Sequence, residues 1–153
     1  MVVQLPQRLS EARIAQLLET WPVARLATVG VDGRPHQVPV VFAQCEGVLW
    51  SPVDGKPKRA GELARSTHVR REPRVSLLLD EYTEDWSRLW WLRVDGEASV
   101  VAPNDPAEVA AVAAELRRKY PQYQTTAVLR EPPVLLRIVP VKIASWCAAP
   151  GPT

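Results

Sequence analysis

Four consecutive residues near the middle of the chain, Lys56-Pro57-Lys58-Arg59, are the strongest candidates for a binding site. The proline fixes the backbone in an extended turn, so Lys56 and Lys58 can project to the same side. A helix is expected to follow, and the free N–H groups at its start add a partial positive charge. Each charge-assisted hydrogen bond from these cations would contribute about 1.5–3 kcal/mol toward holding a phosphate. The alternative is a solvated basic loop without a ligand.

A group of tryptophans, Trp86, Trp90 and Trp91, is the second feature that suggests a ligand. Neighbouring side chains on a strand face opposite sides, so Trp90 and Trp91 cannot both enter one core. The one left outside needs cover from a second subunit or a flat aromatic ligand, because apolar surface of that size is rarely left bare. Trp91 shares its face with Arg93, and this pair suits a planar anionic ligand through stacking and a forked hydrogen bond. The alternative is that one tryptophan fills the core and the other packs under a loop.

Other residue types that perform chemistry lack partners at a suitable spacing. His36 and His68 have no further histidine or carboxylate at metal-ligand spacing, and Cys45 and Cys147 form no CxxC or CxxH pattern. We therefore expect no metal site and two reduced thiols. The carboxylates between residues 80 and 85 crowd one turn, which predicts a solvated turn. Nucleotide and protease motifs such as GxGxxG, Walker and HExxH are absent.

Length and composition indicate an ordinary globular protein with one domain over residues 1–153. The chain has 153 residues, of which 46% are hydrophobic and 24% are charged. Residues 10–147 are expected to be ordered, and residues 148–153 to form a frayed tail. A formal net charge of +2 is too small for a surface that grips nucleic acid. No stretch approaches the ~18 apolar residues of a membrane helix, and no signal peptide is seen. We therefore expect a cytoplasmic protein that binds small molecules.

Two extended runs on either side of an Asp-Gly turn predict a β-hairpin. The runs are residues 23–29 and 34–42, and the turn is Gly30-Val31-Asp32-Gly33. Pro35 and Pro39 cannot donate hydrogen bonds to a neighbouring strand, so the second run is expected to lie at a sheet edge or to be bulged. Its free side is then available to a ligand or a partner.

The remaining segments alternate short helices with strand-like runs. Helices are predicted over residues 10–21, over residues 56–69 with Leu63 and Ala64 on the inner side, and from Pro106 with Asp105 as the N-cap. Strands are predicted at residues 47–51, at 74–79 with both faces buried, in two runs around Asp95-Gly96, and at 133–146. Because strands follow one another without regular helical crossovers, an antiparallel barrel with peripheral helices fits better than a parallel sheet.

Several stretches, taken in order, resemble a known family. They are Ala24–Val29 with Asp32–His36 and Val38–Val40, then Lys56–Arg59, then Arg71–Leu78, then Trp86–Gly96. The first resembles the opening hairpin of the pyridoxamine 5′-phosphate oxidase-like proteins, and the later ones resemble the actinobacterial branch thought to use the deazaflavin coenzyme F420. The resemblance covers residues 10–147. It implies a mostly β fold, a split antiparallel β-barrel of the FMN-binding type, that forms a homodimer with two cofactor sites at the subunit interface.

The resemblance also implies which residues bind the cofactor. Lys56, Lys58 and Arg59 would hold its phosphate, with Ser51 and Ser76 as weaker candidates. Val38, Pro39 and Val40 would lie along the edge of the ring, and Trp91, Arg93 and Trp146 would close the pocket from the partner subunit. No side chain is implied as a catalytic group, because the cofactor itself carries the reactivity.

The function implied is hydride transfer between coenzyme F420 and a small unsaturated or electron-poor substrate. An FMN-binding oxidoreductase on the same fold and a non-catalytic carrier of a flavin or tetrapyrrole are the alternatives. F420 has a poly-glutamate tail that needs extra cations, for which Arg25, Arg34 and Arg88 are candidates. Vitamin B6 oxidation is disfavoured, because the chain ends soon after Trp146 without the substrate-phosphate residues expected of a true pyridoxamine phosphate oxidase.

Overall fold

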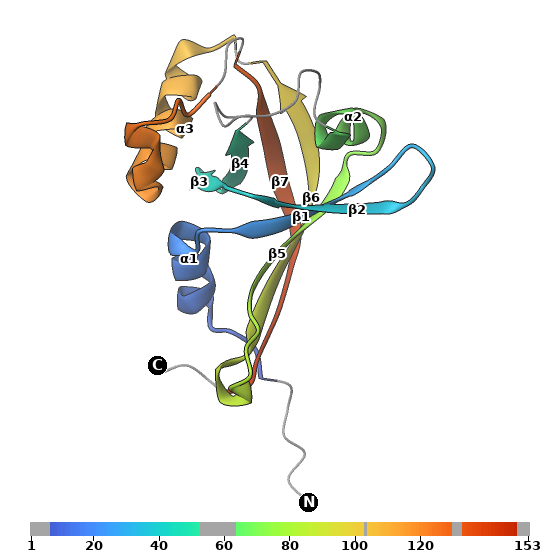
Figure 1. Cartoon of the computed structure of the whole chain (residues 1–153), viewed down its shortest axis with the longest axis vertical. Helices are drawn as coiled ribbons and strands as arrows, with labels where there is room; N and C mark the ends of the chain where they lie inside the picture. Colours follow the sequence, from blue (N-terminus) through green and yellow to red (C-terminus); the bar gives the residue numbers. More distant parts are fainter. Residues whose placement is uncertain (1–6, 53–63, 103, 130–132, 150–153) are drawn as a thin grey trace, which may run out of the picture.

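The computed structural model of the chain describes residues 7–52, 64–102, 104–129 and 133–149 (Figure 1). The helices within these ranges are α1 (Glu11–Thr20), α2 (Ala64–Arg71) and α3 (Pro106–Lys119), with short 3-10 helices at Trp86–Arg88 and Pro121–Gln124. The strands are β1 (Ala24–Val29), β2 (Pro35–Val40), β3 (Ala43–Cys45), β4 (Val48–Pro52), β5 (Arg74–Glu81), β6 (Trp90–Val101) and β7 (Leu135–Cys147).

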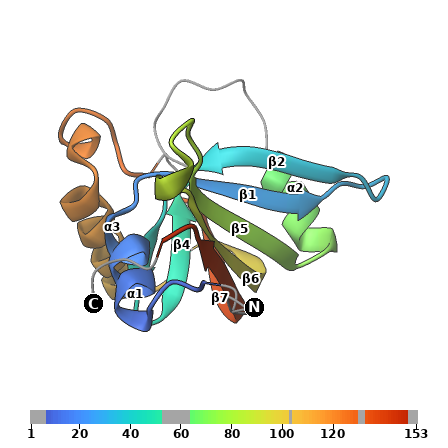
Figure 2. The same ribbon diagram turned by 90° about the horizontal axis from the view of Figure 1, so that it is seen from below.

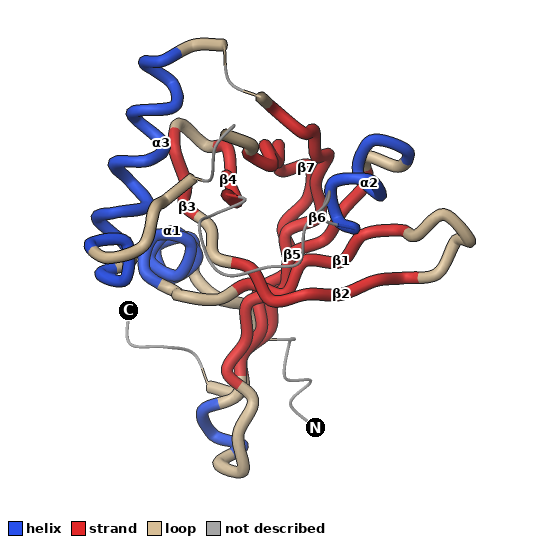
Figure 3. The backbone as a smooth tube through the Cα atoms, turned by 45° about the horizontal axis from the view of Figure 1, so that its top comes forward, coloured by secondary structure: helices blue, strands red, loops and turns tan. Residues whose placement is uncertain are grey.

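All seven strands form one antiparallel sheet in the order β2-β1-β5-β6-β7-β4-β3. The sheet is strongly curled but its two edge strands, β2 and β3, do not pair with each other, so the barrel stays split (Figure 2). Helix α2 lies beside β1 and β6, toward the opposite end of the molecule from α1 and α3 (Figure 3). The predicted antiparallel split barrel with peripheral helices is confirmed.

The β1–β2 hairpin forms as the Asp-Gly signal predicts. Gly33 has a positive φ of 79°, a backbone conformation that glycine adopts without steric cost. The turn is closed by hydrogen bonds from the Gly33 N–H to the Gly30 carbonyl and from the Gly30 N–H to the Arg34 carbonyl. β2 is an edge strand, so Pro35 and Pro39 remove no hydrogen bond from a neighbouring strand on its free side.

The region around Asp95 and Gly96 differs from the sequence prediction, since it holds one strand rather than two. β6 runs through both residues, and its register against β7 shifts between them. A Cβ atom at Gly96 would lie 2.7 Å from the Val139 carbonyl oxygen, so the missing side chain lets β7 approach closely. The Asp-Gly pair therefore stays within the strand, opposite a bulge whose extra residue is Val141 of β7, instead of forming a turn that reverses the chain.

The burial of two other elements also corrects the prediction. β5 was expected to be buried on both faces, but its side chains alternate between buried and half-buried. In α2, Ala64 is exposed, and the helix buries Ser66 and Val69 instead. Leu63 lies outside the described residues. Both errors have one cause, because apolar composition alone does not say which face of an element meets the core.

Two hydrophobic clusters hold the elements together. The first fills the inside of the curled sheet, with Leu26, Leu77 and Leu92 among its fully buried members, and is covered by Leu17 and Leu18 of α1. The second lies between α3 and the outer side of β4 and β7. Its members include Trp50, Val112, Leu116 and Leu135. The structure therefore covers part of the outer side of the sheet with α3.

The helix ends are capped as the sequence indicates. The Ser10 side chain accepts a hydrogen bond from the Arg13 N–H at 3.1 Å, and the Asp105 side chain accepts one from the Ala107 N–H at 2.9 Å.

Cys45 and Cys147 are both free thiols. No helix in the described ranges has the length and apolar character needed to cross a membrane.

Candidate functional site

None of the described helices covers the outer side of β1, β2, β5, β6 and of the second half of β7, and we call this surface the open face. Its residues alternate along each strand with those that enter the core. The pairing of the strands places Ala27 beside Ser76, Leu78 beside Arg93, and Trp91 beside Trp146. The members discussed below are Arg25, Ala27, Ser76, Leu78, Asp80, Trp91, Arg93, Asp95, Ala144 and Trp146. These residues of the open face come from four strands, β1, β5, β6 and β7.

Two neighbouring hollows lie on this face. One has a volume of about 390 Å³, and among its lining residues are Gln37, Tyr82, Trp91 and Arg93. The other, of about 400 Å³, is lined mainly by β1, β5, β6 and Val141. Ala27 and Ser76 line both, so the two hollows meet along the strands β1 and β5. Together they offer a shallow, extended surface suited to a flat ligand or to another protein chain.

The tryptophans divide between the core and the open face as their alternation predicts. Trp90 is buried, packs edge-on against Trp21 with ring centroids 4.8 Å apart, and donates its indole N–H to Glu81 at 3.2 Å. Trp91 and Trp146 are cross-strand neighbours on the open face, and each is half-buried. The third member of the predicted group, Trp86, is 77% exposed in a 3-10 helix at the β5–β6 turn.

On the open face, acidic side chains form ion pairs with the arginines. Asp95 accepts a hydrogen bond from the Ser76 hydroxyl at 2.8 Å and forms an ion pair with Arg93 at 3.3 Å. Asp80 forms an ion pair with Arg25. Two predicted site residues, Ser76 and Arg93, therefore meet at one carboxylate. The sequence analysis did not assign Asp95 to the site, and the only available signal was its alternation with Trp91 and Arg93 along the strand.

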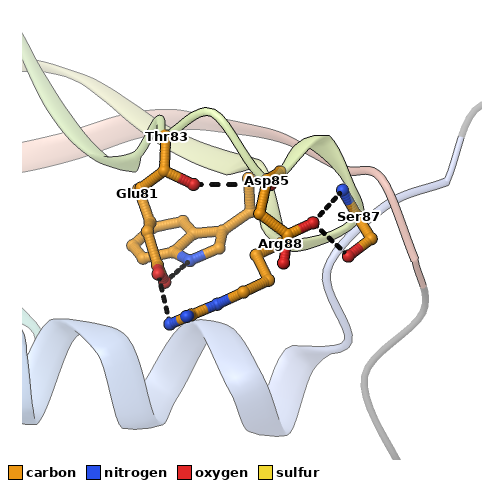
Figure 4. A network of polar contacts seen from close by, with 6 residues as sticks. Glu81, Thr83, Asp85, Ser87 and Arg88 are labelled. Carbon is orange, nitrogen blue, oxygen red and sulfur yellow. Dashed lines mark hydrogen bonds and ion pairs between the residues drawn. The ribbon is translucent and has the colours of Figure 1, made fainter.

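The exposed turn between β5 and β6 is held by hydrogen bonds among its own residues and with the end of β5 (Figure 4). Glu81 accepts hydrogen bonds from Arg88 at 2.7 Å and from the Trp90 indole. The Asp85 carboxylate accepts from both the N–H and the hydroxyl of Ser87, and these bonds lower its pKa. Residues 82–88 are exposed, as the predicted solvated turn requires, whereas Asp80 and Glu81 belong to β5, are half-buried and pair with Arg25 and Arg88.

The three arginines considered for an acidic tail already have acidic partners within the chain. Arg25 pairs with Asp80, Arg34 with Asp32 at 3.3 Å, and Arg88 with Glu81. All three side chains are at least half exposed. Exposed ion pairs of this kind contribute about 0–1 kcal/mol, so a multiply charged ligand could displace them at low cost.

On the edge strand β2, some side chains point into the core and others are exposed. Val38 and Val40 point into the first hydrophobic cluster, whereas Pro39 is exposed opposite Arg25. One side of β2 pairs with β1, and no described strand pairs with its other side. A ligand along this edge would therefore meet the free backbone groups and Pro39, not the side chains of Val38 and Val40.

Ser51 lies near the end of β4 and has an unusual environment. Its side chain is 1% exposed, and its hydroxyl makes no hydrogen bond with any described residue. Such a buried hydroxyl is costly unless a ligand or water satisfies it. The predicted phosphate-binding residues Lys56, Lys58 and Arg59 follow shortly after in the sequence and lie outside the described residues.

One copy of the chain does not bring all the predicted site residues together. Ser51 pairs with Leu136 on β7, whereas Trp91 pairs with Trp146 on the same strand. These β7 residues are ten positions apart, roughly 33 Å along a strand at 3.3 Å per residue. The structure therefore groups Ser76, Trp91, Arg93 and Trp146 and keeps Ser51 apart from them.

The two histidines contact each other, which the sequence did not indicate. Their ring centroids are 5.0 Å apart, and His68 forms a hydrogen bond with the Thr28 hydroxyl at 2.9 Å. This contact joins α2 to the edge hairpin. No group of three or more potential metal ligands occurs among the residues that the structure describes.

The fold and the uncovered sheet face define a split-barrel protein, and sequence comparison identifies its family. The family model for pyridoxamine 5′-phosphate oxidase matches residues 10–147. The chain therefore belongs to the pyridoxamine 5′-phosphate oxidase family. No match to the chain is found among curated proteins.

Solved structures with the same fold have different described roles. The conserved hypothetical protein Rv2991 from Mycobacterium tuberculosis is 25% identical, with a TM-score of 0.74 over 97% of this chain and 91% of that one. The heme storage protein HutZ from Vibrio cholerae is 19% identical, with a TM-score of 0.68 over 92% and 95%. A structure described as an F420 reductase is 20% identical, with a TM-score of 0.55 over 84% and 94%. At these identities the last two establish the fold alone.

Proposed function

We infer that the chain is a flavin-type oxidoreductase that uses the deazaflavin coenzyme F420 and acts on a small unsaturated or electron-poor substrate. The observation that carries this inference is the open face, where Trp91, Arg93 and Ser76 line a hollow that none of the described helices covers. Membership of the oxidase family and the fold shared with an F420 reductase support a redox cofactor. FMN on the same fold is the runner-up.

The described residues fit such a cofactor at both of its ends. At the phosphate end, the Ser51 hydroxyl is buried without a partner, and a phosphate oxygen would satisfy it. The basic residues Lys56, Lys58 and Arg59 follow it in the sequence and would supply the positive charge. At the ring end, half-buried indoles and an exposed guanidinium offer stacking and hydrogen bonding.

A homodimer would join these two ends into one site. In one copy, Ser51 pairs with Leu136, which is far along β7 from Trp146, so a ligand that contacts both ends needs a second copy. Packing two open faces together would also cover Leu78, Trp91 and Trp146, which are left half-buried in one copy. We therefore propose that each site takes its phosphate-binding residues from one subunit and its Trp91, Arg93 and Trp146 from the other.

The protein's part in the reaction would be to position and shield the reacting groups. When bound, the deazaflavin would supply the carbon that donates or accepts a hydride. The free backbone of β2 near Pro39 would fix the ring edge, and Trp91 with Trp146 would exclude water from it. Arg93 is held by Asp95, so its guanidinium is oriented before a ligand arrives.

The test is equilibrium titration of the purified protein with F420 and, separately, with FMN. The proposal predicts that F420 binds more tightly and that Lys58→Ala weakens its binding about tenfold or more, equivalent to about 1.4 kcal/mol. Arg117→Ala is the matched control, because Arg117 is an exposed cation in the last turn of α3, away from the open face. FMN binding without F420 binding would reject the choice of cofactor. An unchanged dissociation constant in Lys58→Ala, with the fold intact by circular dichroism, would reject the phosphate site.

A non-catalytic carrier is the second candidate, because a heme storage protein has the same fold. Heme titration and turnover assays distinguish it from an oxidoreductase. Oxidation of reduced F420 by a candidate acceptor, catalysed at substoichiometric protein, would exclude a simple carrier. Tight heme binding without F420 or FMN binding would favour the carrier. Light scattering at about twice the mass of the 17.0 kDa chain would support the homodimer.

A further inference from the structure

Two aromatic side chains are exposed on the turn between β5 and β6, residues 82–88, which we call the arm. Tyr82 is 70% exposed and Trp86 is 77% exposed, whereas the other aromatic residues that the structure describes are buried or half-buried. The arm projects from the end of the sheet, away from α3 (Figure 1). Tyrosine and tryptophan are the residues that most often anchor protein–protein contacts. The proposed cofactor site uses Trp91 but gives Trp86 no role.

Hydrogen bonds hold the arm in one conformation (Figure 4). The Asp85 carboxylate accepts from the N–H and the hydroxyl of Ser87, at 3.1 and 2.6 Å. The Thr83 hydroxyl donates to the Asp85 carbonyl at 3.3 Å, and Arg88 donates to Glu81 of β5 at 2.7 Å. A turn that is already ordered loses little conformational entropy on binding, so the arm can present Trp86 to a partner at low cost.

An apolar hollow of about 170 Å³ lies elsewhere on the chain, between the start of β1, the end of β2 and the 3-10 helix that follows α3. We call it the tyrosine pocket, because Tyr120 and Tyr123 line it together with Val23, Val41 and Thr126. A cavity of about 150 Å³ holds a benzene ring, whereas pockets for drug-sized ligands measure about 300–1,000 Å³. The size of the pocket therefore suits one aromatic side chain better than a whole small molecule.

The proposed dimeric site brings the arm of one subunit close to the tyrosine pocket of the other. Val41 directly follows β2, so the pocket lies just beyond the ring edge expected at Pro39. Trp91 from the other subunit is expected to close the same ring pocket. The arm is next to Trp91, because Trp86 precedes it by five positions and Tyr82 lines the same hollow. The arm and the pocket are thus each a few residues from groups that the site joins.

We propose that the arm of each subunit docks on a second copy of this chain, with its Trp86 indole in the partner's tyrosine pocket. The proposal rests on the homodimer proposed above and adds a contact that fixes its geometry. In a two-fold dimer the contact occurs twice, because each chain supplies one arm and one pocket. Burying Trp86 and Tyr82 of both chains would supply about 600 Å² of the ~1,600 Å² typical of a stable interface. The open faces would supply the rest.

The test measures the dimer dissociation constant by sedimentation across a dilution series, without cofactor. Trp86→Ala should raise it at least about a hundredfold, because each dimer loses two anchors. Val31→Ala is the matched control, since Val31 is 65% exposed on the β1–β2 turn and its truncation should change the constant by less than about twofold. A wild-type chain that stays monomeric, or a Trp86→Ala constant within about tenfold of the wild-type value, would overturn the proposal.

Filling the tyrosine pocket tests where the indole lies. Thr126→Phe adds a ring to the lining of the pocket and should weaken dimerisation as Trp86→Ala does. Val23→Phe fills it from the β1 side and replaces Thr126→Phe if circular dichroism shows that the latter does not fold. The double variant of Trp86→Ala with the filling change should dimerise no more weakly than Trp86→Ala alone, because both changes remove the same contact. Additive losses would show that the indole and the pocket do not meet, and would overturn the proposal.

A small ligand is the rival occupant of the tyrosine pocket. If the filling variants leave dimerisation unchanged and weaken only the binding of F420 or of a substrate, the pocket belongs to that ligand and the proposal is wrong. The dissociation constants are measured without F420. A wild-type chain that dimerises through the arm but does not bind F420 would therefore support this contact while rejecting the proposed cofactor.

Discussion

Replacing Tyr120 by phenylalanine tests how the second cluster is joined to the edge hairpin. Tyr120 is 5% exposed, and its hydroxyl accepts a hydrogen bond from the Phe42 N–H at 3.0 Å. The same hydroxyl lies 2.9 Å from both the Phe42 and the Pro22 carbonyl oxygens. With one proton it can donate to one of them at a time. A single oxygen atom thus connects the end of α3 to two chain connections.

The cost of Tyr120→Phe follows from the groups it leaves behind. The ring remains, so packing changes little, but the buried Phe42 N–H loses its acceptor and one carbonyl loses a donor. A buried polar group left unsatisfied costs about 1–3 kcal/mol, so we expect a loss of about 2–4 kcal/mol in the free energy of unfolding. At about 2–4 °C per kcal/mol for a protein of this size, the melting temperature should fall by roughly 4–16 °C.

The assay is urea denaturation followed by tryptophan fluorescence at one fixed protein concentration, because dimerisation would make the stability depend on concentration. Tyr82→Phe is the matched control, since Tyr82 is 70% exposed, and it should change stability by less than about 0.5 kcal/mol. If Tyr120→Phe stays within that limit with an unchanged denaturant slope, the hydroxyl does not hold these connections and the reasoning is refuted.

Three further predictions concern the bulge, a helix cap and alkaline pH. Gly96→Ala should destabilise the protein by about 1–3 kcal/mol, because the new Cβ would meet the Val139 carbonyl oxygen; a melting temperature equal to that of the wild type would contradict this. Asp105→Ala should cost about 1 kcal/mol in urea denaturation and Asp105→Asn less, since asparagine still caps the helix. Burial raises the pKa of Tyr120 to about 12, so its contribution to stability is fully present below pH 10 and is lost as the pH rises through about 12. Ultraviolet titration should show one late phenol that is missing in Tyr120→Phe.

Local signals in the sequence were sufficient to predict the elements that do not depend on distant partners. The Asp-Gly turn predicted the β1–β2 hairpin, and the prolines correctly placed β2 at an edge. Asp105 and Pro106 located the start of α3. In each case the determining interaction lies within a few residues, so the sequence contains it directly.

Features that depend on contacts between distant segments could not be predicted in the same way. Asp95-Gly96 has the composition of a turn, but pairing with β7 keeps both residues within β6, opposite a bulge at Val141. Asp80 looked like part of a solvated turn because its partner, Arg25, is 55 positions away. The meeting of Ser76 and Arg93 at Asp95 likewise follows from the register of β5 on β6.

The bulge at Val141 of β7, opposite Asp95 and Gly96, divides the long β6–β7 pair into two regions whose residues are constrained differently. On one side of the bulge, Leu135 of β7 is buried against α3. Substitutions there are therefore limited by the stability of the folded chain. On the other side, no helix of the described ranges covers Trp91 and Trp146. Changes there would leave the monomer's interior intact, and relatives sharing this scaffold could acquire new ligands by altering that half alone.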